Sequence, residues 1–266
     1  MNYLVPLGME ELAVLQQKYG FRVAASSYSE DESESIPGNE GMIPLNALLD
    51  PGGCTAFLDG LAARLGTDSR PIAASMFAKR YAAIAVMPYF HALTCYDKAL
   101  ELTFETMRLR SGKHWLDGIT FDLPLRAVPC TERREAWRSH AAESLIRHHL
   151  SSLWQSLSSC SGLPMAIIWE NMAVRIYSLY EKKLRNCGEV SAARIEEDFW
   201  FLLHELPAEA FMQRRQPFAR FYGDGAPPEE ARNHGSGGTR TRLTCCLYYR
   251  VSKGGEYCDA CPKHAR

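Results

Sequence analysis

Four cysteines near the C-terminus constrain this sequence more than any other feature. Cys245 and Cys246 are adjacent, and Cys258 and Cys261 follow after eleven intervening residues, with two residues between them. Thiolates are soft ligands that suit zinc and iron–sulfur clusters, and four of them complete the usual ligand set of either. The other five cysteines are scattered singly along the chain. The four C-terminal cysteines are therefore the candidate metal site.

The spacing within each pair sets a geometric condition. A tight turn between Cys258 and Cys261 would let both sulfurs point at one metal. Adjacent residues of an extended chain point to opposite sides, so Cys245 and Cys246 can converge on one site only if the backbone bends there. Three structures are consistent with the pattern: a zinc ribbon, which normally uses two CxxC pairs, a disulfide framework, which needs an oxidising compartment, and an iron–sulfur cluster. The pattern favours the cluster and leaves the other two open.

Composition and charge exclude several classes of protein. The chain has 266 residues, of which 46% are hydrophobic, enough for one sizeable core or two small ones. A net charge of -1 gives no general attraction to polyanions, so we expect no nucleic-acid partner. The sequence has no apolar run long enough to span a bilayer, and its first residues lack the basic leader of a signal peptide. We expect a cytoplasmic protein with reduced cysteines, and we leave open a peripheral association with the inner membrane.

Helical spacing of apolar residues dominates the first part of the chain. We expect a short helix over residues 8–18 and two helices within 44–66 that are broken at Pro51. A long buried helix is expected to begin near Ser69 and to be kinked or ended by Pro88, because proline cannot donate a helical hydrogen bond.

The pattern changes over residues 100–128, where apolar and polar residues alternate and turn residues intervene, which indicates a β-hairpin or a small meander. Residues 131–207 return to helical spacing and predict a bundle. The expected fold class is therefore α+β, mostly helical, with a small antiparallel sheet or hairpin and a C-terminal cysteine-rich tail.

Two polar stretches are expected to be solvated loops. Residues 26–40 are acidic, and residues 223–238 are rich in glycine and proline. The second stretch leads to a division into a region of residues 1–239 and a C-terminal segment of residues 240–266.

Basic residues accompany the cysteines. A cluster bound by four thiolates carries net negative charge, so nearby cations would stabilise it and raise its potential. We expect Arg242 and Arg250 to tune such a cluster or to guide a partner, and Lys253 and Lys263 to be solvated.

Several motifs resemble one known family. The stretch Arg242–Arg250 (RLTCCLYYR), followed by Cys258–Pro262 (CDACP), resembles the C-terminal signature of siderophore-iron reductases of the FhuF family. Met87–His91 (MPYFH) and Ile168–Met172 (IWENM) are also similar to that family, and the N-terminal part resembles the ferric iron reductase-like domain shared with siderophore synthetases. The resemblance covers the chain from Ile43 to its end. Family members usually have ten residues between the two cysteine pairs, and this chain has eleven.

The resemblance implies a [2Fe-2S] cofactor and a ferric-siderophore reductase, an oxidoreductase that acts on a metal ion. Its substrates would be ferric hydroxamate siderophores of the ferrioxamine, ferrichrome or coprogen type, reduced in the cytosol. Residues 1–239 would form the ferric iron reductase-like, siderophore-binding region, and residues 240–266 the cluster-binding segment. No catalytic residue is implied beyond the cluster, whose ligands would be Cys245, Cys246, Cys258 and Cys261.

The electron source is expected to be external. The sequence has neither a GxGxxG motif after a strand nor a GxxxxGK[ST] motif, so we expect a ferredoxin or a flavin reductase as donor. Two other functions stay open: a zinc-stabilised helical binding protein, and a siderophore-binding protein without electron transfer.

Overall fold

The structure is a computed structural model. The polar stretch at residues 26–40, the loop at residues 223–238 apart from Gly223, and Cys187 lie outside the part of the chain that it describes. The described residues are 3–23, 42–111, 115–186, 188, 190–223 and 240–263.

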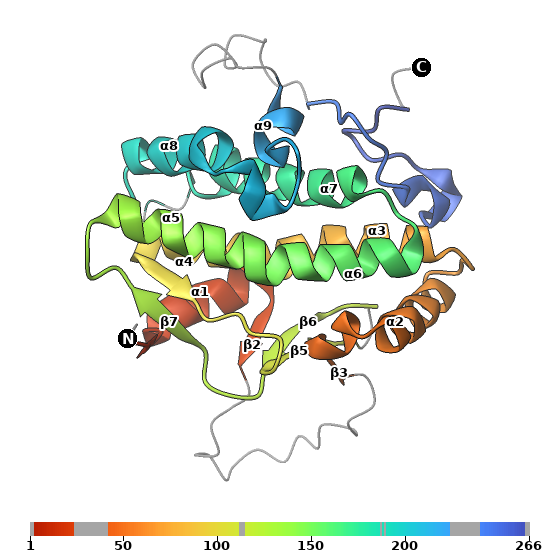
Figure 1. Cartoon of the computed structure of the whole chain (residues 1–266), viewed down its shortest axis with the longest axis horizontal. Helices are drawn as coiled ribbons and strands as arrows, with labels where there is room; N and C mark the ends of the chain where they lie inside the picture. The colour runs from red at the N-terminus through yellow and green to blue at the C-terminus, as the bar shows by residue number, and fades with distance from the viewer. Residues whose placement is uncertain are drawn as a thin grey trace.

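Two long helical runs form the middle of the molecule, with further layers above and below them (Figure 1). The runs are α3 (Arg70–Tyr81), η2 (Ala82–Val86) and α4 (Met87–Tyr96), and α5 (Arg134–Ser144), η3 (Leu145–Leu150) and α6 (Ser151–Ser161). Above them in Figure 1 lie α7 (Met165–Ser178), η4 (Leu179–Lys183), α8 (Ala192–Trp200), η5 (Phe201–Glu205), η6 (Ala208–Phe211) and α9 (Pro217–Tyr222). Below them lie the strands together with α1 (Met9–Tyr19), η1 (Leu45–Leu49) and α2 (Pro51–Arg64).

The strands form two small sheets. One has the order β1-β7-β4, is antiparallel throughout, and consists of Val5–Pro6, Arg126–Pro129 and Lys98–Leu100. The other has the order β2-β6-β5-β3 and consists of Phe21–Val23, Gly118–Phe121, Met107–Arg110 and Met42–Pro44. Strands β5 and β6 form the antiparallel hairpin that the alternation predicts, whereas β2 joins β6 in parallel. The expected α+β fold with a small antiparallel sheet is confirmed.

The helix boundaries follow the sequence signals, with one exception. The break within residues 44–66 is confirmed at Asp50, whose side chain accepts a hydrogen bond from Gly53 N–H at 2.8 Å and caps α2. Pro88, however, does not end its helix, which continues to Tyr96. The turn before it is a π-helix in which Met87 N–H donates to the carbonyl of Ala82, five residues earlier. The helix already has the wider spacing of a π-turn where Pro88 lacks its donor.

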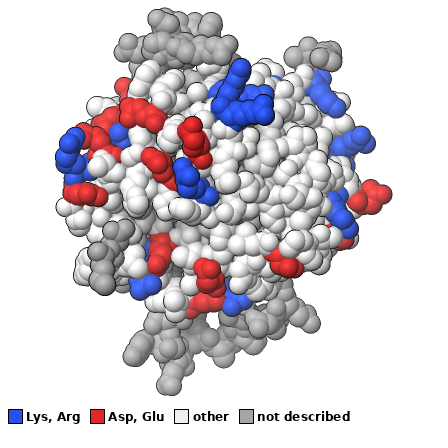
Figure 2. Space-filling model, viewed as in Figure 1, with Lys and Arg blue, Asp and Glu red and all other residues white. Residues whose placement is uncertain are grey.

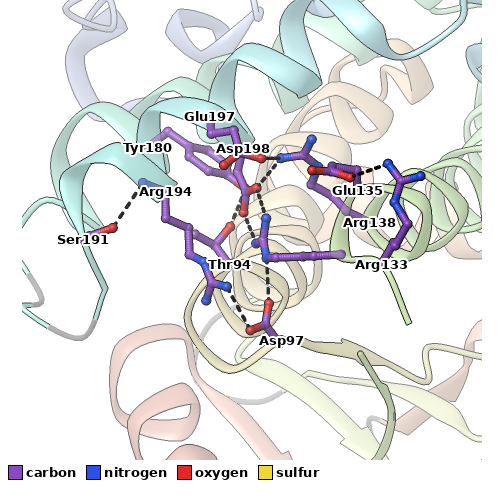
Figure 3. Close-up of polar contacts among 11 residues, drawn as sticks. Thr94, Asp97, Arg133, Glu135, Arg138, Tyr180, Ser191, Arg194, Glu197 and Asp198 are labelled. Carbon is purple, nitrogen blue, oxygen red and sulfur yellow. Dashed lines mark hydrogen bonds and ion pairs between the residues drawn. The ribbon is translucent and has the colours of Figure 1, made fainter. Parts of the chain in front are cut away.

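A buried ionic network joins α5, α8 and the end of α4 (Figure 3). The carboxylate of Asp198 is inaccessible to solvent and accepts two hydrogen bonds from Arg134 and one from Arg138, each 2.7 Å long. Arg134 also donates to Asp97 at 2.8 Å. Burial alone would lower the pKa of Arg134, but the Asp198 and Asp97 carboxylates raise it overall. These paired charges fix the helices at one end of the molecule.

No helix in the described ranges is long and apolar enough to cross a membrane.

Candidate metal centre

All four C-terminal cysteines lie in the described segment 240–263, called here the C-terminal segment. It lies beside one end of α3 and α7, at the right in Figure 1, and has little regular structure apart from η7 (Tyr248–Arg250) and η8 (Lys253–Gly255). Cys246 and Cys261 are buried, and Cys245 and Cys258 are half-buried. We call these four residues the cysteine site.

The structure brings the four thiols close together. The sulfurs of Cys246 and Cys258 are 3.7 Å apart. Cys245 has both Cys261 and Cys246 as neighbours. Burial, followed by the neighbouring Cys246, raises the pKa of Cys258 to about 11. Burial also raises the pKa of Cys245. Cys245 and Cys258 therefore keep their protons at neutral pH, and a metal that binds them must displace those protons.

Both local conditions set by the spacing are met. Leu247 adopts a left-handed conformation with φ of 64°, and its N–H points back to Cys245 Sγ at 3.4 Å. This bend lets two adjacent cysteines serve one site. Cys261 N–H donates to the carbonyl of Cys258 at 2.8 Å and closes the tight turn expected between those two residues.

Helix α3 anchors the backbone at Cys246. The hydroxyl of Ser75 donates to the carbonyl of Cys246 at 2.7 Å. The side-chain amide of Asn171, from α7, donates to the hydroxyl of Ser75 at 3.0 Å and to its carbonyl at 3.1 Å. Ser75 and Asn171 are both buried, so these bonds replace hydration that the polar groups lose on folding.

Helix α7 supplies a second anchor through Glu170, which is only 1% exposed. Its carboxylate accepts hydrogen bonds from the N–H groups of Leu243 and Thr244, at 2.6 and 2.7 Å, and from the hydroxyl of Thr244. The guanidinium of Arg242 lies 3.6 Å from the same carboxylate. Arg242 N–H also donates to Ala260 at 2.9 Å and so joins the two stretches that carry the cysteines.

Three cations lie near the cysteine site. Lys79 Nζ lies 4.0 Å from Cys246 Sγ. Arg175 and Arg242 are the other two, and their Nε atoms are buried without a hydrogen-bond partner among the described residues. Burial lowers the pKa of Lys79 and of Arg175, and repulsion by neighbouring guanidinium groups adds to the effect.

These cations indicate what the site is built to hold. These three cations are largely withdrawn from water, and Glu170 is the buried carboxylate beside them. Such an arrangement has a high free-energy cost unless a further anionic group compensates the positive charge. A cluster bound by four thiolates carries that negative charge, so the residues present fit it. Elsewhere, on the face shown in Figure 2, acidic and basic side chains are interspersed.

The cysteine site is not preformed around a metal. The described ranges contain no group of three or more His, Cys, Asp or Glu side chains already placed to hold a metal ion. The eight described cysteines are all free, so the disulfide framework is not formed among them.

Two cavities bear on where a substrate could bind. One, of about 340 Å³, lies beside the cysteine site and is lined by Thr67, Asp68, Ser69, Ile72, Leu247 and Arg250. The other, of about 610 Å³, lies between β4, β7 and the α5–η3 run, and none of its lining residues comes from the C-terminal segment. Of these two cavities, the smaller one reaches the C-terminal segment, at Leu247 directly after Cys246 and at Arg250.

The basic residues named from the sequence have different surroundings. Arg242 is buried against Glu170, and Arg250 lines the smaller cavity and donates to the hydroxyl of Tyr249 at 3.2 Å. Lys253 is exposed, as expected. Lys263 is exposed but donates to the same Tyr249 hydroxyl at 3.1 Å.

Sequence reasoning missed the residues that support the site from outside the C-terminal segment. Ser75, Lys79 and Arg175 lie within stretches whose sequence indicates buried or amphipathic helices. No local pattern distinguishes these three residues from others of the same helices. Glu170 and Asn171 do have a signal, because they are the polar pair inside the IWENM stretch. A charged residue and an amide together on a buried helix face require buried partners, which the C-terminal segment and Ser75 supply.

Comparisons with known proteins agree with this geometry. A family model described as ferric iron reductase FhuF-like transporter matches residues 75–226, and one described as FhuF 2Fe-2S C-terminal domain matches residues 242–263. No curated protein matches the chain. Among solved structures, the chain is similar to ATP-bound aerobactin synthetase IucA from a hypervirulent pathotype of Klebsiella pneumoniae, with 14% identity and a TM-score of 0.50.

That likeness covers 73% of this chain and 41% of the synthetase chain, and at this identity it shows a shared fold alone. The first family model spans more than half of the chain, and the second includes the whole cysteine site. The chain therefore belongs to the family of FhuF-like ferric iron reductases and has the [2Fe-2S] C-terminal domain of that family.

Proposed function

We propose that this protein reduces ferric hydroxamate siderophores of the ferrioxamine, ferrichrome or coprogen type by one electron and releases ferrous iron in the cytoplasm. Family membership supports an iron–sulfur reductase of the ferric siderophore type. The observation that carries the proposal is the cysteine site itself, which has four neighbouring thiols, two of them with sulfurs 3.7 Å apart, and three cations nearby.

The four cysteines hold the [2Fe-2S] cluster in this proposal, and the bound cluster accepts and donates single electrons. The rest of the chain positions the ligands. Ser75 and Glu170 hold the backbone on either side of the adjacent cysteines, and Lys79 places positive charge against Cys246. Residues 240–266 thus act as the cluster-binding segment on a platform made by residues 1–239.

The chemistry needs no acid–base residue. Hydroxamate oxygens are hard donors and hold ferric iron far more tightly than the softer ferrous ion. One added electron converts ferric to ferrous iron, the iron–oxygen bonds weaken, and the hydroxamates are released intact and take up protons from water. Because the sequence has no nucleotide-binding motif, the electron comes from an external donor of the ferredoxin or flavin-reductase class.

We place the chelate at the cavity beside Leu247. Its wall includes Ile72, which suits the apolar surface of a hydroxamate chelate, and Asp68 and Arg250, which offer polar contacts at its edge. Leu247 directly follows Cys246, so a molecule in this cavity lies close to the cysteine site.

Stopped-flow reduction of a hydroxamate chelate tests the proposal. The protein is reduced anaerobically, freed of reductant, and mixed with ferrioxamine B in the presence of a ferrous-specific chelator. We expect the visible absorption of the oxidised cluster to return as ferrous iron is captured. The gallium complex of the same siderophore is the matched control, because Ga³⁺ has the same charge and cannot accept the electron.

Two outcomes would overturn the proposal. A reduced spectrum that persists with ferrioxamine B as it does with the gallium complex would indicate a binding protein without electron transfer. A colourless protein that contains zinc would indicate a structural clip.

A further inference from the structure

The order of the cysteines along the chain suggests a simple division of ligands. Cys245 and Cys246 would bind one iron, and the CxxC turn of Cys258 and Cys261 would bind the other. The structure instead places a sulfur of one sequence pair against a sulfur of the other, at Cys246 and Cys258.

We infer that Cys246 and Cys258 share one iron of the cluster and that Cys245 and Cys261 share the other. The inference rests on the proposed ligand set and adds the division of that set between the two irons.

The sulfur separation supports the first pair. Two thiolates at about 2.3 Å from one tetrahedral metal ion lie about 3.8 Å apart. The sulfurs of Cys246 and Cys258 are 3.7 Å apart, so one iron can bridge them with little movement of either side chain. Two ligands on each iron then leave Cys245 and Cys261 for the other iron.

The backbone explains why the pairs cross. The adjacent side chains of Cys245 and Cys246 point in different directions and so can face different partners. The chain turns directly after them, where Leu247 is left-handed. The hydrogen bond from Arg242 N–H to the carbonyl of Ala260 holds the two cysteine-bearing stretches side by side, and Ser75 fixes the carbonyl of Cys246.

Each pair has one buried cysteine, Cys246 or Cys261, and one half-buried cysteine, Cys258 or Cys245. A nearby cation distinguishes the first pair, because Lys79 Nζ lies 4.0 Å from the sulfur of Cys246. The reduced form contains one ferrous and one ferric iron, so ligands of the two irons can be distinguished by spectroscopy.

Carbon-13 NMR of the reduced holoprotein, labelled at cysteine β-carbons, tests the division. Signals of cysteines on the ferric iron and on the ferrous iron shift differently with temperature, and single Cys→Ser variants assign them. We expect Cys246 and Cys258 to share one temperature dependence, and Cys245 and Cys261 to share the other. A common dependence for Cys258 and Cys261 would overturn the inference.

A second measurement covers the case in which the serine variants lose the cluster. Diamide takes two electrons and two protons from each pair of neighbouring thiols, and peptide mapping then identifies the disulfides formed in the cluster-free protein. We expect bonds from Cys246 to Cys258 and from Cys245 to Cys261. Bonds within the sequence pairs would overturn the inference. Cys130, whose thiol lies 3.4 Å from the carbonyl of Glu132, is the control that should stay free.

The failure of this inference differs from the failure of the proposed function. A protein that binds a [2Fe-2S] cluster and reduces ferrioxamine B with ligands divided by sequence order would refute the crossed pairs alone. A protein without the cluster would refute the function.

Discussion

Single charged residues decide the electrostatics of the cysteine site. Lys79 Nζ lies 4.0 Å from Cys246 Sγ. The same ammonium group lies 4.7 Å from the centre of the Tyr248 ring. Reduction adds negative charge to the cluster, so a nearby cation stabilises the reduced form and raises the potential. Lys79 reaches the site from α3 and not from the C-terminal segment.

Replacement of Lys79 with methionine should lower the reduction potential. The expected shift is tens of millivolts, since about 59 mV corresponds to a tenfold change for a one-electron couple. Spectroelectrochemical titration of the purified holoprotein measures it. Lys253→Met is the matched control, because Lys253 is an exposed lysine of the C-terminal segment and its charge is screened by solvent. Equal potentials in the two variants would contradict the role given to Lys79.

The residues of the site were predictable only where their spacing is local. The four cysteines lie within seventeen residues of one another, and their types and spacing identify a metal site. Lys79 and Glu170 are separated from Cys246 by 167 and 76 residues, so only the fold brings them there. The contact between the sulfurs of Cys246 and Cys258 was likewise not predictable, because it joins the two sequence pairs across a loop of eleven residues.

Helix α7 is bound to the C-terminal segment through hydrogen bonds to one buried carboxylate. Its Glu170 accepts three hydrogen bonds from Leu243 and Thr244, directly before the adjacent cysteines, and is buried beside Arg242. Loss of one partner of a buried charge pair is costly because the other charge remains in the interior without compensation. The segment should therefore detach from α7 when this carboxylate is removed.

Substitution of Glu170 by glutamine tests this connection. We expect a local loss of about 3 kcal/mol, which is roughly a 100-fold faster amide exchange at Leu243 and Thr244. Hydrogen exchange followed by mass spectrometry measures it. The control is Glu181→Gln, which removes the partly exposed pair between Glu181 and Arg240 and should cost at most about 1 kcal/mol. Unchanged exchange in the Glu170 variant would show that α7 does not hold the segment.

Secondary structure was predicted best where one pattern persists. The long helices and the β5–β6 hairpin are confirmed because their apolar spacing is regular over several turns or residues. The π-turn before Pro88 was not predicted, because one extra residue in a turn leaves the local composition unchanged. The pairing of β2 with β6 and of β3 with β5 joins residues far apart in sequence, for which a single chain contains no signal.

For the whole molecule, the cysteine site depends on the integrity of the helical body. The C-terminal segment is held by Ser75 from one layer and Glu170 from another, and its own regular structure is limited to two short turns. The buried network around Asp198 joins α5, α8 and the end of α4, which is the far end of the helical run that begins with α3 (Figure 3). The four cysteines are therefore positioned by the body as a whole, in keeping with the family matches to both parts of the chain.

The metal content of the protein purified without oxygen tests the central claim most directly. Iron, acid-labile sulfide and the visible spectrum are measured for the unaltered chain, for Cys258→Ser, and for Cys130→Ser as the matched control. We predict iron and sulfide in equal amounts with a [2Fe-2S] spectrum in the unaltered chain and in Cys130→Ser, and their loss or strong depletion in Cys258→Ser. Zinc in place of iron, or an unchanged cluster in Cys258→Ser, would contradict the account.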